Sequence, residues 1–137
     1  MGAVPAVLVT AAALTLGRRR RRFRRLVRLA CLGRNLRPAT SYQARYAVCA
    51  ARWVTQLMPM RWACMEESTS AALLLALAGR RAEWRHGVAM DPVRLHAWIV
   101  DPYDNPVEEP DDTALYTSTH TPDGPGAARD RQGANRE

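Results

Sequence analysis

The chain carries the three residue types of a cysteine-dependent acyl-transfer site in one order: Cys64, then His96, then an acidic pair, Glu108 and Glu109. In such a site a thiolate attacks a carbonyl carbon, a histidine takes the thiol proton and later protonates the leaving amine, and a carboxylate fixes which imidazole nitrogen is protonated. Backbone N–H groups beside the cysteine would stabilise the oxyanion. Each signal is weak alone, but their combination and order predict a Cys-His-acid triad.

The segment that follows Cys64 predicts a helix from about residue 65 to residue 78, with Gly79 as its stop. A thiol at a helix N-terminus lies among exposed N–H groups that favour the thiolate. Glu66 and Glu67 suit the helix dipole, but carboxylates so close to Cys64 would raise the pKa of its thiol. The position of the cysteine therefore indicates a reactive thiol, whereas its acidic neighbours disfavour the thiolate.

An earlier helix is predicted between the capping residues around Thr40 and the break at Pro59. Large side chains recur along it at spacings of four, three, four and four residues, which predicts one core-facing stripe: Tyr42, Tyr46, Cys49, Trp53 and Leu57. Cys49 is accordingly interpreted as a core residue, and Cys31 as a hydrophobe on a helix face.

After Gly79 the hydrophobic period changes to that of strands. The runs at about residues 82–90 and 94–100 each alternate, and the second has apolar residues on both faces, which predicts a central strand that holds His96 in the core. The short segment 106–109 is expected to return antiparallel to it, and only one of Glu108 and Glu109 can then face the site. The expected fold class is α+β, with N-terminal helices packed on a small antiparallel sheet.

The charge of the chain is concentrated in one segment. Of a formal net charge of +7, seven arginines lie within residues 18–25, so the remainder is close to neutral. Only Phe23 interrupts these arginines and no groove-reading motif follows, so nucleic acid is not expected as a partner.

Three widely spaced cysteines without metal-ligand spacing predict reduced thiols in the cytoplasm, and no metal or cofactor.

Three segments are expected along the chain. Residues 1–37 form an apolar and Arg-rich helical segment, residues 38–116 form the catalytic domain, and residues 117–137, poor in apolar residues, form a disordered tail. The N-terminal apolar run is shorter than the roughly 20 residues that span a bilayer. Packing of that helix on the domain is the first interpretation, and a peripheral membrane contact through residues 4–28 is the alternative.

Two blocks of the sequence resemble the stand-alone leader peptidases of lasso-peptide biosynthesis, the B2 proteins, which are small cysteine proteases of transglutaminase-like, papain-related fold. The resemblance covers roughly residues 38–116. Its first block has the pattern Trp-x-Cys-x-Glu-x-Ser and consists here of Trp62, Cys64, Glu66 and Ser68. Its second block consists of His96, Ala97 and Trp98.

The resemblance implies that Cys64 is the nucleophile and His96 the general base and acid. It implies a carboxylate after a Pro-Val pair as the third member, which favours Glu109 and leaves Glu108 as the alternative. Near-site residues would be Trp62, Glu66, Ser68 and Trp98. One departure is Glu67, since the family commonly has a basic residue three positions after the cysteine.

The implied reaction is removal of the leader from a ribosomally made lasso-peptide precursor through a thioester acyl-enzyme, which frees the core amine for macrolactam formation. The implied partners are the precursor leader, a separate leader-recognition protein of the B1 (RRE) type and the ATP-dependent cyclase. Two alternatives from other classes stay open. One is a non-catalytic interaction protein that works through its arginine segment, and the other is an acyl transferase with the same triad.

Overall fold

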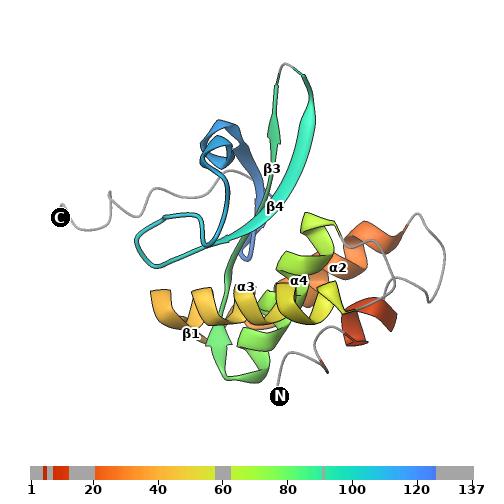
Figure 1. The fold of residues 1–137 in the computed structure, drawn as a ribbon, viewed down its shortest axis with the longest axis vertical. Helices are drawn as coiled ribbons and strands as arrows, with labels where there is room; N and C mark the ends of the chain where they lie inside the picture. The colour runs from red at the N-terminus through yellow and green to blue at the C-terminus, as the bar shows by residue number, and fades with distance from the viewer. Residues whose placement is uncertain (1–4, 6–7, 13–20, 58–62, 91, 126–137) are drawn as a thin grey trace.

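The computed structural model describes residues 5, 8–12, 21–57, 63–90 and 92–125. It is a mixed α+β fold in which helices and a small antiparallel sheet lie against each other (Figure 1), as the sequence predicts. After a short helical stretch at residues 8–12, the elements in chain order are α2 (Arg22–Ala30), β1 (Arg37–Pro38), α3 (Ser41–Gln56), α4 (Cys64–Leu77), β2 (Arg80–Arg81), β3 (Glu83–Ala89), β4 (Arg94–Val100), η2 (Asp111–Leu115), β5 (Thr117–Thr121) and β6 (Gly124–Pro125).

Helix α4 lies at the centre of the helical part, where α2, α3 and β4 all pack against it. Its sequence is apolar or small around most of the circumference, which is typical of a buried helix. Nine of its residues are buried, from Glu66 to Leu75. Leu26 and Ala30 of α2 are buried as well, so α2 packs with α4 in the helical part of the fold.

Helix α3 faces the core with a different stripe from the predicted one. Its buried residues are mostly small: Ala44, Ala47, Val48, Ala51, Val54 and Thr55. The predicted stripe is instead exposed, with Trp53 at 65% and Tyr42 at 78% exposure, and Cys49 is exposed too. Alanines let α3 approach α4 closely, whereas the aromatic stripe is too bulky for that contact. The interpretation of Cys49 as a core residue is therefore wrong, while Cys31 is half-buried and packs against the core.

The antiparallel sheet has the strand order β4-β3-β5-β6. The strand that holds His96, β4, is thus an edge strand and not the predicted central one, because β3 takes that place. An isolated antiparallel bridge between Val100 and Pro106 lies beside β4, and the Val107 N–H donates to the Ile99 carbonyl at 2.9 Å. Tyr116 contacts the Trp98 ring, with centroids 6.1 Å apart, so Trp98 is buried although it lies on an edge strand.

The prediction of a disordered tail from residue 117 onward is wrong for residues 117–125. These residues form β5 and β6, and β5 pairs antiparallel with β3, with Val88 opposite Thr117. Strand pairing is made by the backbone, so the polar, β-branched threonines of this segment suit a strand without an apolar pattern. Residues 126–137 lie outside the described residues.

The predicted membrane contact through residues 4–28 falls partly outside the described residues. Within the described parts of the chain, no helix has both the length and the apolar character needed to cross a bilayer. Of the short helical stretch, Leu8 and Val9 are exposed and Thr10 is buried.

Candidate active site

Cys64 is the first residue of α4, and its thiol lies where the helix exposes unpaired backbone N–H groups. The preceding residue, Ala63, is the N-cap of the helix and has an extended backbone with ψ 170°. The Glu66 carboxylate turns back and accepts the Ala63 N–H at 3.1 Å, and it also pairs with Arg22 of α2. Glu66 therefore stabilises the helix start and does not face the thiol.

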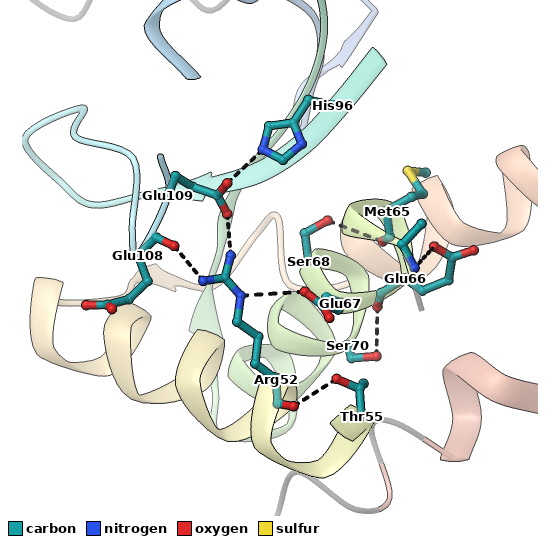
Figure 2. A network of polar contacts seen from close by, with 11 residues as sticks. Arg52, Thr55, Met65, Glu66, Glu67, Ser68, Ser70, His96, Glu108 and Glu109 are labelled. Carbon is teal, nitrogen blue, oxygen red and sulfur yellow. Dashed lines mark hydrogen bonds and ion pairs between the residues drawn. The ribbon is translucent and has the colours of Figure 1, made fainter. Parts of the chain in front are cut away.

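His96 lies on β4 between the helix start and a buried carboxylate. Its Nε2 is 2.7 Å from Glu109 Oε2, and Figure 2 marks this contact with a dashed line. The imidazole stacks on the Trp98 ring, with centroids 5.6 Å apart and planes 12° apart, and Tyr116 contacts it from another side. Because Nε2 is engaged by Glu109, Nδ1 is the nitrogen left for the hydrogen bond with Cys64.

The electrostatics of this pair favour a reactive thiol. Burial raises the pKa of the Cys64 thiol, but hydrogen bonds with His96 and with the backbone N–H of Ala97 lower it, and the net pKa lies below its ordinary value. The pKa of His96 is raised to about 9, first by the hydrogen bond with Cys64 and next by that with Glu109. A lowered thiol pKa beside a raised imidazole pKa favours the thiolate–imidazolium pair at neutral pH.

The two adjacent carboxylates of the predicted triad point in different directions. Glu108 has a φ of +54°, in the left-handed region, and its side chain pairs with Arg45 at 2.7 Å on the surface of α3. The next side chain, Glu109, is only 6% exposed and faces His96. The structure therefore brings together Cys64, His96 and Glu109, and leaves Glu108 outside the site.

Arg52 of α3 is a site residue that the sequence analysis did not single out. Its guanidinium pairs with Glu109 Oε1 at 2.7 Å and with Glu67 Oε2 at 3.5 Å, and it donates to the Glu108 carbonyl (Figure 2). In the sequence it is one of 20 basic residues. The signal that could have found it is Glu67, an acidic residue in an unusual place that needs a cation nearby.

The remaining predicted near-site residues have different surroundings. Trp98 supports the imidazole of His96 by stacking. The Ser68 hydroxyl accepts a hydrogen bond from the Trp84 indole N–H at 3.0 Å and donates to the Met65 carbonyl. Trp62 lies outside the described residues. A small pocket adjoins the thiol and is lined by Val48, Arg52, Cys64, Glu67, Ser68, Ile99 and Glu109.

No group of three or more His, Cys, Asp or Glu side chains within the described part of the chain is arranged to hold a metal ion. The chemistry that this arrangement can perform is acyl transfer through a cysteine thiolate, with an imidazole as the proton carrier and a carboxylate that orients it.

A thiol at the start of a buried helix, with a histidine and a carboxylate from the sheet side, is the arrangement that cysteine-dependent acyl transfer requires. The sequence profile of the transglutaminase-like superfamily matches residues 6–121, and the chain belongs to this superfamily. No curated protein and no solved structure is significantly similar to the chain. Membership in the superfamily indicates activity of the cysteine protease or acyltransferase type. The profile also extends past residue 116, in agreement with the strand β5 at 117–121.

Proposed function

We propose that the protein is a cysteine peptidase that removes the leader from a ribosomally made lasso-peptide precursor. The observation that supports this most strongly is the alignment of Cys64, at the start of α4, with the His96–Glu109 pair, together with the lowered pKa of the thiol. The step from peptidase to leader peptidase rests on the resemblance of the Trp62–Ser68 and His96–Trp98 blocks to that family.

The reaction follows from the proton positions. The Cys64 thiolate attacks the scissile carbonyl carbon, and the oxyanion forms near the first N–H groups of α4. The C–N bond then breaks as the imidazolium of His96 gives its proton to the leaving amine, which becomes the N-terminal amine of the core peptide. A thioester with the leader remains. His96 next takes a proton from water, the hydroxide attacks the thioester, and the leader leaves with a free carboxylate while the thiol is restored.

The proposal includes partners. A separate leader-recognition protein would deliver the precursor, and an ATP-dependent cyclase would use the freed amine for the macrolactam. The proposed location is the cytoplasm, where reduced thiols persist. A membrane contact through the apolar and Arg-rich residues 4–28 remains the alternative use of that segment.

The acyl transferase alternative uses the same triad, because a second amine in place of water would resolve the same thioester. The non-catalytic alternative is disfavoured by the lowered pKa of Cys64, since an inert buried thiol has a raised one.

The test is mass spectrometry of the precursor encoded beside this gene, incubated with its recognition protein and the wild type, Cys64→Ala or Cys49→Ser. Cys49 is an exposed thiol on α3 and serves as the matched control. A single cut with wild type and Cys49→Ser, absent with Cys64→Ala, is expected. A product joined to an added amine would favour transfer over hydrolysis, and intact precursor with folded wild type would overturn the peptidase proposal.

A further inference from the structure

We propose that Arg52 is a positioning residue for the reaction: its guanidinium holds the Glu109 carboxylate against His96 and balances the charge of Glu67. The proposal rests on the proposed function, because it concerns the same site. Arg52 itself reaches the triad only through Glu109, and it comes from α3, which carries no member of the Cys-His-acid set.

The first support is geometric. The Glu109 carboxylate is divided between two partners, with Oε2 on His96 Nε2 and Oε1 on Arg52 Nη2, each at 2.7 Å. A third contact from Arg52 to the Glu108 carbonyl fixes the backbone next to Glu109. With both oxygens and the adjacent backbone held, the carboxylate has one orientation toward the imidazole. The planar guanidinium suits this task, because its N–H groups diverge in a rigid fork that a lysine ammonium lacks.

The second support is the placement of two carboxylates in one pocket. Glu67 of α4 and Glu109 both line the pocket beside Cys64, and Arg52 lies between them (Figure 2). Burial raises the pKa of Glu67, the Arg52 charge lowers it, and the Glu109 charge raises it again. Two neighbouring carboxylates without a cation cannot both remain ionised easily. Arg52 therefore supplies the positive charge that both carboxylates share.

The position of the Glu109 carboxylate determines which imidazole nitrogen of His96 faces Cys64. The Glu109 carboxylate accepts a hydrogen bond from Nε2–H of His96, which leaves Nδ1 to face Cys64. Without Arg52, one oxygen of the Glu109 carboxylate loses its partner, and the carboxylate can turn away from Nε2 and no longer stabilise the positive imidazole beside the thiolate. Loss of Arg52 should therefore weaken the thiolate and not only the substrate turnover.

Several other ionisable groups face this centre, and all of them except Glu67 are left unchanged in every variant. Cys64 and Glu67 approach from α4, His96 lies on β4, and the His86 and Tyr116 side chains are nearby on β3 and after η2. Among these, only Glu67 competes with Glu109 for the Arg52 charge.

The experiment measures the rate at which iodoacetamide alkylates Cys64 against pH, read by peptide mass so that Cys31 and Cys49 are separated from it. The variants are Arg52→Gln, Arg52→Lys, the double variant Arg52→Gln/Glu67→Gln, and Arg45→Gln as the matched control, since Arg45 pairs with Glu108 outside the site. Circular dichroism checks that each variant folds. The reaction with iodoacetamide needs no peptide substrate, so it tests Arg52 apart from the proposed function.

The Arg52→Gln variant is expected to move the alkylation profile to higher pH by about one unit, which is about a tenfold loss of rate on the rising part of the profile. Arg52→Lys should lose less, the double variant should recover most of the rate, and Arg45→Gln should match the wild type. An unchanged profile in folded Arg52→Gln would overturn the proposal, as would an equal loss in the double variant. Cleavage of the precursor by the same proteins then tests the peptidase separately, since a shifted profile with no cleavage by wild type would refute only the proposed function.

Discussion

At the residue scale, Glu108 and Glu109 show how one backbone angle separates two identical side chains. The positive φ of Glu108 costs roughly 1–2 kcal/mol for a residue with a Cβ, and it turns the two carboxylates toward different partners. Glu108 meets Arg45 on the surface, and Glu109 meets His96 and Arg52 in the interior. Their sequence positions alone leave the choice open, because alternation says only that they differ.

This separation makes the first prediction. Glu109→Gln should lower kcat/KM by about 10²-fold, because the amide cannot supply the charge that stabilises the imidazolium. Glu108→Gln should change kcat/KM less than about twofold, since it removes only a surface ion pair. Steady-state cleavage of the precursor measures both, and a larger loss in Glu108→Gln than in Glu109→Gln would reverse the assignment.

The pKa directions at Cys64 and His96 make the second prediction. The pKa of the thiol is lowered and that of His96 is raised to about 9, so the thiolate–imidazolium pair exists between those two values. Cleavage should therefore rise with pH as the thiolate forms. It should fall again as pH passes about 9, because His96 then has no proton for the leaving amine. A pH–rate profile of acylation measures this, and a rate that is still rising above that pH would contradict it.

At the element scale, the periodicity of the sequence predicts α3, α4, β3 and β4 correctly, because helix and strand periods are local properties. The same periodicity fails to say which stripe of α3 is buried, since the aromatic stripe and the alanine stripe both repeat as a helix does. Only the close approach to α4 decides between them, and that is a tertiary contact. The strand β5 is missed because Thr-Ser-Thr-His-Thr has no apolar alternation to detect.

The two stripes of α3 make the third prediction. Ala51 is fully buried against the core, so Ala51→Leu should overpack it and lower the free energy of unfolding by about 2 kcal/mol. Trp53 is 65% exposed, so Trp53→Ala should change that free energy by less than about 0.5 kcal/mol. Urea denaturation measures both, and a Trp53→Ala variant that loses more than Ala51→Leu would restore the original interpretation of the helix.

At the scale of the whole molecule, segments far apart in the chain meet at one place. Arg81, at the end of β2, pairs with Glu83 at the start of β3 and with Asp123 in the turn before β6, and it donates to the Arg34 carbonyl. The parallel pair of β1 and β2 joins the start of the α3 segment to the end of the α4 segment. Apart from the Arg81–Glu83 pair, which is local, these contacts join segments far apart in the chain, so no short sequence window contains them.

The C-terminal strands make the fourth prediction. A chain that ends after Tyr116 lacks β5 and β6, which exposes one edge of β3 and removes the Asp123 pair of Arg81. The free energy of unfolding of this truncated chain should fall by about 2 kcal/mol, which lowers its Tm by roughly 8 °C. A chain that ends after Pro125 is the control and should keep the Tm of the full chain, because it retains β5, β6 and the Asp123 pair of Arg81. Calorimetry measures both, and equal Tm values for the two truncations would contradict the role of β5.

The nucleophile and its base belong to different layers of the fold, Cys64 to the helices and His96 to the sheet. Their hydrogen bond therefore crosses the boundary between the helices and the sheet, and its length depends on how tightly the two layers pack. A temperature below Tm that weakens the packing between the two layers would separate the Cys64 thiol from the His96 imidazole while every helix and strand is still intact. The rate of Cys64 alkylation thus reports on the packing between the helices and the sheet. This rate should decline at a lower temperature than the far-ultraviolet circular dichroism signal.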